Sequence, residues 1–406
     1  MKILHIYDHT APLHSGYVFR SQTLRHGLMG AGHICDIASG VRHYSSSHLK
    51  YTGDEVIDDE YYHRTKPHQI QFPVLREIAD IYALARKIYG LIHTEHYDIL
   101  HIHSPLLGGY AALLARFFSR LFGKNKNIKI VYEIRAFWED AATDHGTLKP
   151  HSLKYRIIQN LETKLCHKVH HIYPICHGIK NDLIQRGVAE HKMTVIPNVI
   201  NVGEFTPDKP FPEMLAQKYN LSSHHKILGF IGSFYHYEGV ADLIPLLSCL
   251  LKYDTSYRLL LVGGGLAQDN INNAIGQYGL QDYVIMTGRV PHDDVADYYA
   301  LCSAMIYPRH KMRLTDTTTP LKPLESMCLK KLVFLSDIDG HRELVHDGET
   351  GIFLPVKQDY RHNANIIHQT LCDKVRVQNI INNAYHYVTH HHAVDEIVKK
   401  YYKLSS

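Results

Sequence analysis

Short apolar runs bounded by glycine, proline or aspartate alternate along the chain with longer stretches in which apolar residues recur every three or four positions. The short runs are typical of strands buried in a parallel sheet, and the longer stretches are typical of the helices that cover it. Helices are predicted, for example, over Glu77–His93 and Leu107–Phe122. In the first half of the chain the predicted strands are Ile3–Tyr7, His33–Ala38, Ile99–His103, Ile128–Ile134, His170–Pro174 and Met193–Pro197.

The same pattern restarts after a polar, proline-containing stretch at Asn198–Pro212, which is typical of a connector between domains. We therefore expect an α/β fold of two doubly wound, Rossmann-like domains that face each other across a cleft. The expected domains are residues 1–205 and 206–385, and a C-terminal helix over 386–406 is expected to pack back on the first domain. The predicted strands of the second half are Ile227–Ile231, Arg258–Val262, Tyr283–Thr287, Ala304–Tyr307, Leu332–Leu335 and Gly351–Leu354.

The composition narrows the class of protein. With 45% apolar residues among 406, the chain can build two packed cores, and its net charge of +4 gives no global field that favours nucleic acid. The seven cysteines lack CxxC spacing, and the 33 histidines form neither HExxH nor a Cys/His quartet, so no metal or other cofactor is expected. No segment has the length of a signal-peptide core or a membrane span. These features predict a cytoplasmic protein.

Ligands of open α/β sheets bind beyond the carboxyl ends of the strands, so the segments after each predicted strand are the candidate sites. Gly16 lies in the first such turn, where a backbone N–H and a helix N-terminus could meet an anion, although an ordinary βα turn reads the same way. His103 ends the third strand, where taken alone it is more typical of a structural histidine. After the fourth strand, the run from Glu133 to Asp140 holds the only tryptophan among many charges, and it fits a binding loop or a salt-bridged loop equally well.

In the second half, glycines follow the first two strands, at Gly232-Ser233 and at Gly263-Gly264-Gly265. Glycine permits close approach of a backbone to phosphate or base. The strongest segment runs from Tyr307 to Met327 and joins a strand end to a helix start. A phosphate beside Lys322 and a ribose diol on Glu325 would suit this segment, and the alternative for Glu325 is a helix-capping carboxylate.

In their joint order these segments resemble family 4 of the retaining glycosyltransferases, which has the GT-B fold of two Rossmann-like domains. The resemblance covers nearly the whole chain and is closest to the bacterial exosortase-associated, polysaccharide-locus branch. It is carried by Ile196-Pro197-Asn198, Ile231-Gly232-Ser233, Leu261 to Gly265, Thr287 to Val290, Pro320 to Met327, Gly340 to Glu343 and Gly348 to Gly351.

The resemblance implies a sugar transfer from a nucleoside-diphosphate sugar to a glycan, lipid-linked or other acceptor in surface polysaccharide or glycoconjugate synthesis, with retention. It implies that Gly16 lies under the donor diphosphate, that His103 contacts the transferred sugar, and that Glu325 binds the ribose. The backbone near Arg289 and Val290 would meet the base. Positive groups aimed at the leaving phosphate would stabilise it without a metal. The donor site drawn from the motifs comprises Gly16, Gly232, Ser233, Gly264, Arg289, Val290, Arg309, Arg313, Lys322, Pro323, Leu324 and Glu325.

Two positions depart from the family pattern. The first of its two spaced glutamates is replaced by Thr317, with Asp316 beside it as a substitute, so either residue is a catalytic candidate with His103. The usual arginine and lysine after the first strand of the second domain are replaced by Ser233 and Glu238. The diphosphate charge must then be met elsewhere, and Arg309, Arg313 and Lys322 are the basic candidates.

Other functions fit the same architecture. An epimerase of sugar nucleotides or a phosphorylase would use a similar cleft, and a catalytically weak nucleotide- or glycan-binding subunit would fit the two departures. A dehydrogenase is disfavoured because GxGxxG is missing from the sequence.

A membrane contact is predicted from Tyr110 to Lys129, since an anionic bilayer surface could present a lipid-linked acceptor. The apolar residues there share a helical face, as in an interfacial helix, although a helix that covers a sheet needs such a face too. The apolar set is Leu114, Phe117, Phe118, Leu121 and Phe122, and the basic set is Arg116, Arg120, Lys124, Lys126 and Lys129.

Overall fold

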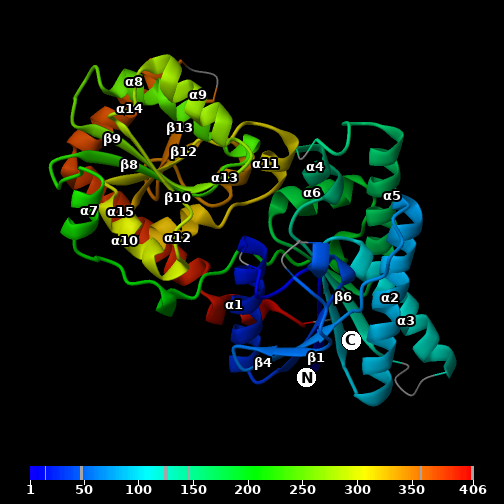
Figure 1. Cartoon of the computed structure of the whole chain (residues 1–406). Coiled ribbons are helices and arrows are strands. Elements are labelled where there is room, and N and C mark those ends of the chain that lie inside the picture. Colours follow the sequence, from blue (N-terminus) through cyan, green and yellow to red (C-terminus); the bar gives the residue numbers. More distant parts are fainter. Residues whose placement is uncertain (14, 46–48, 123–126, 145, 357–358, 404–406) are drawn as a thin grey trace. The chain divides into compact units, whose positions relative to one another are not determined.

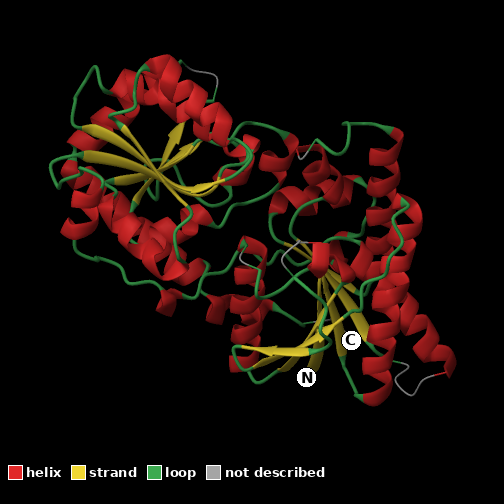
Figure 2. Cartoon of the chain, viewed as in Figure 1, coloured by secondary structure: helices red, strands yellow, loops and turns green. Residues whose placement is uncertain are grey.

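The computed structural model describes the chain apart from residues 14, 46–48, 123–126, 145, 357–358 and 404–406, and apart from the side chain of residue 73. The chain divides into two compact units (Figure 1). One unit comprises Met1–Val199 together with Val394–Ser406, and the other comprises Ile200–Ala393. In each unit, helices lie on both faces of a twisted sheet, as Figure 2 shows.

The described part of the first unit contains a seven-stranded sheet in the order β3-β4-β2-β1-β5-β6-β7. Neighbouring strands run parallel, and β3 pairs antiparallel with β4 at one edge. The strands are β1 (Lys2–Tyr7), β2 (Ile34–Ser39), β3 (Glu55–Ile57), β4 (Glu60–Arg64), β5 (Ile99–His103), β6 (Lys129–Ile134) and β7 (His171–Pro174).

The predicted strand Met193–Pro197 is wrong. The segment is not assigned as a strand. It nevertheless runs beside β7, with a bridge between Ile172 and Met193 and with backbone N–H groups of Thr194 and Ile196 donating to the carbonyls of Ile172 and Pro174. Its last two carbonyls, those of Ile196 and Pro197, accept hydrogen bonds from the Arg20 guanidinium, so they are satisfied without another strand. The short strands β3 and β4 escaped prediction because they are polar and carry no apolar run.

Alternation along the strands divides the core of the first unit between two layers. Ile3 and Ile99 pack on one face against α1 and the chain after Val394, whereas Leu4 and Ile102 pack on the other face with α2 and α3. The helices are α1 (Gly16–Gly30), α2 (Pro73–Thr94), α3 (Leu107–Phe122), α4 (Trp138–Asp144), α5 (Leu153–Lys168), α6 (His177–Gln185) and, from the chain's end, α16 (Val394–Ile397).

The described part of the second unit contains a parallel six-stranded sheet in the order β10-β9-β8-β11-β12-β13. Its strands are β8 (Lys226–Ser233), β9 (Tyr257–Gly264), β10 (Val284–Gly288), β11 (Ala304–Tyr307), β12 (Leu332–Ser336) and β13 (Ile352–Leu354). Its helices are α7 (Glu213–Lys218), α8 (Leu243–Leu250), α9 (Gln268–Tyr278), α10 (Val295–Leu301), α11 (Arg313–Thr317), α12 (Lys322–Cys328), α13 (Asp339–Arg342), α14 (Tyr360–Cys372) and α15 (Lys374–His391).

The chain's last segment returns to the first unit. The predicted start of that segment, at residue 386, falls inside α15, and the part assigned to the first unit begins at Val394. The α1 backbone makes room for it, because a Cβ on Gly27 would lie 2.4 Å from Val394 Cγ2.

Each sheet has one point where the strand order reverses. In the first unit this point lies between β1 and β5, and in the second it lies between β8 and β11. Connections leave such a pair of strands in opposite directions, which opens a crevice at their carboxyl ends. These two crevices are where ligands are expected.

Candidate active site

The crevice of the second unit is built on Gly232, the penultimate residue of β8. Its φ of +142° is a conformation that side chains rarely adopt, and a Cβ there would lie 2.4 Å from Lys322 Cε. The glycine therefore lets the aliphatic part of Lys322 lie directly on the strand end. Any larger residue would displace the lysine.

A buried carboxylate holds two cations beside this glycine. Glu238 Oε1 accepts hydrogen bonds from Lys322 Nζ at 2.7 Å and from Arg309 Nη2 at 3.0 Å, and its Oε2 lies 3.3 Å from Arg309 Nε. Burial alone would raise the pKa of Glu238, but Arg309 and Lys322 lower it to about 2. Burial lowers the pKa of Lys322, and Glu238 opposes that effect. The group has two positive charges and one negative charge, so it carries a net +1.

This arrangement explains one departure of the sequence from its family pattern. Glu238 stands where a basic residue was expected, and it orients Arg309 and Lys322 toward the same strand end. The positive charge at the crevice thus comes from the segment just after β11 and from the start of α12. Figure 1 shows β8 and α12 in the same unit.

Glu325 lies in the first turn of α12 and is partly buried. Burial raises the pKa of its carboxyl, and its Oε2 accepts a long hydrogen bond of 3.5 Å from Tyr299 Oη. It does not cap the helix, since the cap residue Leu321 receives no side-chain hydrogen bond. The alternative reading of Glu325 as a capping carboxylate is therefore wrong.

The motif residues next to Glu325 are less available to a ligand. Leu324 is fully buried in the hydrophobic core, and Pro323 is buried and has no N–H to donate. A ligand contact through either side chain is excluded by this packing. These residues position Glu325 and Lys322.

Both candidates for the missing first glutamate take part in internal hydrogen bonds. The Thr317 hydroxyl donates to the Arg313 carbonyl at 2.7 Å, and Asp316 Oδ1 accepts from the backbone N–H of Asp339 at 3.2 Å. Arg313 is exposed at the start of α11. Gly340 lets α13 approach this turn, because a Cβ there would lie 2.2 Å from the Thr315 carbonyl oxygen.

The remaining donor candidates lie at the same carboxyl edge of the sheet. Ser233 is exposed at the end of β8, and Gly264 ends β9. Arg289 is exposed just after β10, and Val290 is partly buried against the core. The carboxyl edge of this sheet therefore has small residues, Ser233 and Gly264, next to the charged group of Glu238, Arg309 and Lys322.

In the first unit, His103 is almost fully buried at the end of β5. Its Nδ1 accepts from Arg135 Nη2 at 2.9 Å, so the proton lies on Nε2, which donates to His5 Nδ1 at 3.1 Å. Burial and the neighbouring His101 hold the pKa of His103 well below its usual range, so the ring is neutral. Both ring nitrogens are engaged inside the protein.

The three buried imidazoles of His5, His101 and His103 have ligand atoms within 4.8 Å of one another, a spacing that would suit a metal. Two guanidinium groups, those of Arg20 and Arg135, lie beside them and share the carboxylate of Glu133. Burial alone would raise the pKa of Glu133, but these arginines hold it well below its usual range. A further cation would meet two positive charges and one negative charge, which disfavours a metal here.

The charged run after β6 is mostly a network of ion pairs. Glu139 bonds Arg186 at 3.0 Å, and Asp140 accepts from Tyr155 Oη at 2.6 Å. Trp138 stacks on Arg42, whose guanidinium carbon lies 4.9 Å from the ring centroid. Gly16, by contrast, is exposed at the first position of α1, behind the cap residue Ser15, and that first turn contains no acidic residue.

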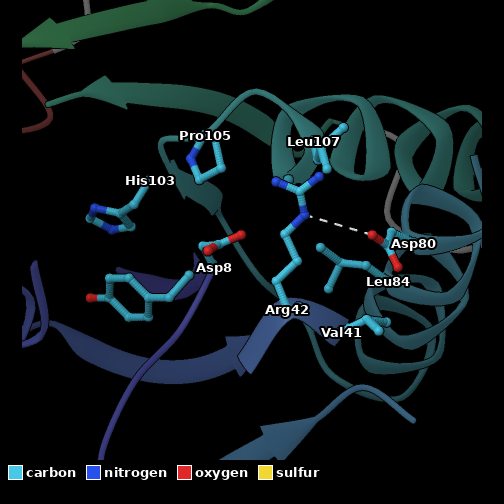
Figure 3. Close-up of a pocket in the computed structure, with 11 residues that line it drawn as sticks. Asp8, Val41, Arg42, Asp80, Leu84, His103, Pro105 and Leu107 are labelled. Atoms are coloured by element: carbon cyan, nitrogen blue, oxygen red, sulfur yellow. Dashed lines mark ion pairs between the residues drawn. The ribbon is translucent and has the colours of Figure 1, made fainter. Parts of the chain in front are cut away.

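A pocket lies at the crevice between β1 and β5 (Figure 3). It is lined by Asp8, Arg42, Asp80 and His103 together with apolar residues. Of these residues only His103 was a candidate from the sequence. Asp8 directly follows a predicted strand, so the sequence could have identified it as a site residue. Asp80 lies inside α2, and only the fold places it at the pocket.

The comparisons with known proteins agree with this geometry. The family described as "Glycosyl transferases group 1" matches residues 213–387, and "Glycosyltransferase Family 4" matches residues 20–204. The chain is 24% identical to N-acetyl-alpha-D-glucosaminyl L-malate synthase of Bacillus anthracis over 77% of its length and 75% of that protein. It is 26% identical to alpha-D-kanosaminyltransferase of Streptomyces kanamyceticus, and that match spans 35% of each chain. A solved structure of Anabaena HepE in complex with UDP and glucose superposes with a TM-score of 0.71 at 17% identity, over 98% of both chains.

The chain therefore belongs to the family 4 glycosyltransferases of GT-B fold, a class of enzymes that take their sugar from a nucleotide donor. The two family matches fall on the two units, the first from residue 20 and the second up to residue 387. No helix in the described part of the chain is both long enough and apolar enough to cross a bilayer.

Proposed function

We propose that this protein transfers a glycosyl group from a nucleoside-diphosphate sugar to a hydroxyl of a glycan or lipid-linked acceptor. The observation that carries the proposal is the group of Arg309, Lys322 and Glu238 beside Gly232. This group has a net positive charge and lies at the crevice between β8 and β11, where the order of the strands reverses. Such a site suits a diphosphate. The UDP complex of the similarly folded Anabaena protein supports a uridine nucleotide as the first donor to test.

In this proposal Lys322 and Arg309 bind the diphosphate and stabilise it as it leaves, with no metal required. Glu325 binds the ribose, and the backbone at Arg289 and Val290 meets the base. Gly16, at the first turn of α1, is proposed to give its backbone N–H to the diphosphate as well. His103, with Asp316 or Thr317, acts on the transferred sugar.

The remaining features are inferred from resemblance. We propose retention of configuration, membership of the exosortase-associated, polysaccharide-locus branch, and a role in surface polysaccharide or glycoconjugate synthesis at the cytoplasmic face of the membrane. The relative from Bacillus anthracis is named N-acetyl-alpha-D-glucosaminyl L-malate synthase, which supports transfer to an acceptor other than water.

Substitution of the donor-site residues tests the proposal. Lys322→Ala and Glu325→Ala are each expected to weaken nucleotide binding by about 1.5–3 kcal/mol, because each removes a charged hydrogen bond. Lys252→Ala is the matched control, since Lys252 is exposed before β9 at the opposite end of the strands. Isothermal titration of UDP, GDP and ADP into each variant measures the loss. Unchanged affinity in both folded variants would contradict the site.

His103→Ala belongs in the same series. It is expected to lower the transfer rate more than the nucleotide affinity, because His103 lies in the other unit from the Lys322 site. A collapse of nucleotide binding with a normal rate at saturation would show that the assigned role is wrong.

The same preparation separates the alternative activities. With a labelled nucleotide sugar, an epimerase converts the free donor without acceptor, and a phosphorylase requires inorganic phosphate. A non-catalytic binding subunit binds the nucleotide but leaves the donor intact. Transfer that depends on an added acceptor is the result expected here.

A further inference from the structure

We infer that His386 and His390, on the exposed face of α15, form a binding site for a divalent transition metal ion such as Zn²⁺ or Cu²⁺. Neither residue belongs to the donor site, and the metal site does not depend on the proposed sugar transfer. Three features of α15 support it: the spacing of the two rings, the position of one imidazole proton, and the charges along the helix.

The two histidines lie four positions apart on one helix, so their rings are on the same face, one turn apart. Both side chains are exposed, and their ring centroids are 6.3 Å apart. Val388, which is buried in the core, lies two positions from each histidine and therefore about 200° around the helix. The pair thus points away from the core, in an arrangement that binds zinc on other helices.

The proton of the His390 ring is placed by the helix backbone. His390 Nδ1 lies 2.8 Å from the carbonyl oxygen of His386 and donates to it, because a carbonyl can only accept. In the neutral imidazole the lone pair is then on Nε2. Histidines that bind a metal usually donate their second ring N–H to a carbonyl or carboxylate, which fixes the orientation of the ring. His390 therefore has the tautomer that a ligand binding through Nε2 requires.

The charges along α15 favour a cation at this pair. From residue 377 to residue 391 the helix contains no lysine, arginine, aspartate or glutamate, so no fixed positive charge of this stretch opposes an ion. Both histidines lie near the end of the helix, where the backbone carbonyls carry a partial negative charge. The buried histidine cluster of the first unit differs, because two guanidinium groups lie beside it.

The two imidazoles also determine which ions fit. Nitrogen ligands suit Zn²⁺, Cu²⁺ and Ni²⁺, whereas Mg²⁺ and Ca²⁺ prefer oxygen. With two protein ligands, water fills the remaining coordination positions, so the site is weaker than a structural zinc site with four protein ligands. An ion held by both rings would tie the last turn of α15 together, just before the chain enters the first unit at Val394.

Hydrogen exchange at the end of α15 tests the site, because it reports on this segment and not on ions bound to other histidines. An ion that binds only the folded turn slows exchange by a factor of 1 + [L]/Kd. Zn²⁺ at about ten times its Kd should therefore slow exchange of residues 386–391 roughly tenfold in the wild-type chain. Mg²⁺ at the same concentration should leave it unchanged.

His386→Ala and His390→Ala should each abolish the effect of Zn²⁺, and alanine keeps the helix because its helix propensity is high. His386→Gln and His390→Gln form a second pair of variants, since glutamine also favours a helix. His391→Ala is the matched control, because His391 is exposed in the same turn but lies five positions from His386, and its ring packs on Tyr387. This control should retain the slowing by Zn²⁺.

Exchange without metal shows whether each variant keeps α15 folded. Any one of four results would overturn the inference: no effect of Zn²⁺ on the wild-type chain, an equal effect of Mg²⁺, a full effect of Zn²⁺ in a folded variant of either histidine, or loss of the effect in His391→Ala.

Discussion

Glu238 is the residue on which the donor site depends. Removing one partner of a buried ionic group leaves the others uncompensated, and here two cations would remain beside Gly232. We expect Glu238→Gln to lower the free energy of unfolding by about 3–5 kcal/mol. A bound nucleoside diphosphate would then replace the lost counter-charge, so saturating UDP should raise the melting temperature of the variant more than that of the wild type.

Thermal denaturation with and without UDP tests this prediction, with Asp242→Asn as control. Asp242 forms a half-exposed ion pair with His310, which contributes little. Glu238 has a folded-state pKa of about 2, below its unfolded value, so its contribution is complete above about pH 4.5 and is lost as the pH falls toward 2. The stability gap between wild type and Glu238→Gln should narrow over that range. A constant gap, or none at pH 7, would contradict the role of Glu238.

Helix α3 contains most of the predicted membrane contact. The structure leaves Phe117, Leu121 and Phe122 more than half exposed, whereas Leu114 and Phe118 are partly buried. Arg120 is exposed, Arg116 bonds His170, and Lys129 lies in β6. Lys124 and Lys126 lie outside the described residues. The apolar surface at the end of α3 is thus smaller than the sequence suggested.

A second exposed apolar surface lies on the first turns of α2, where Val74 and Ile78 are also more than half exposed. Sedimentation with anionic vesicles separates the two helices. We expect the wild-type chain to bind at low salt, with about 1 kcal/mol from each basic residue, and to be released at high salt. Phe117→Ser with Phe122→Ser should abolish binding, and Val74→Ser with Ile78→Ser should not. If only the α2 variant fails to bind, α2 is the membrane surface, and equal binding to neutral vesicles would exclude the basic-helix mechanism.

The last segment of the chain, from Val394, completes the first unit. Tyr401 Oη donates to Glu133 Oε2 at 2.7 Å, and the Tyr402 hydroxyl lies 2.6 Å from His101 Nδ1. The last segment thus covers the buried charges next to His103, although in the sequence it follows the whole of the second unit.

Truncation after Ala393 should therefore destabilise the first unit selectively. Hydrogen exchange is expected to speed up in β1, β5 and β6 and to remain slow in β8 and β9, because the apolar cluster that the last segment joins lies in the first unit. Lys399→Ala, which removes only an exposed pair with Glu396, should leave the exchange unchanged. Equal loss of protection in both units would show that the last segment does not belong to the first unit alone.

Features that depend on neighbours along the chain could be predicted from the amino-acid sequence. The bounds predicted for β5 and β11 agree with the structure. Strands that are buried on both faces of a parallel sheet consist of a continuous apolar run, which can be recognised in the sequence. The polar strands β3 and β4 have no such signal and were missed. Gly232, Lys322 and Glu325 were identified for the same reason, since each follows a predicted strand or opens a helix.

How distant charges combine could be seen only in the folded chain. Glu238 and Lys322 are 84 positions apart, and nothing local to either residue shows that a carboxylate replacing a lysine would hold another lysine in place. Asp80 reaches its pocket from within a helix, where its spacing resembles that of any core-facing residue. Electrostatic partners are chosen by distance in space and by burial, and both are set only when the strands have been ordered around each crevice.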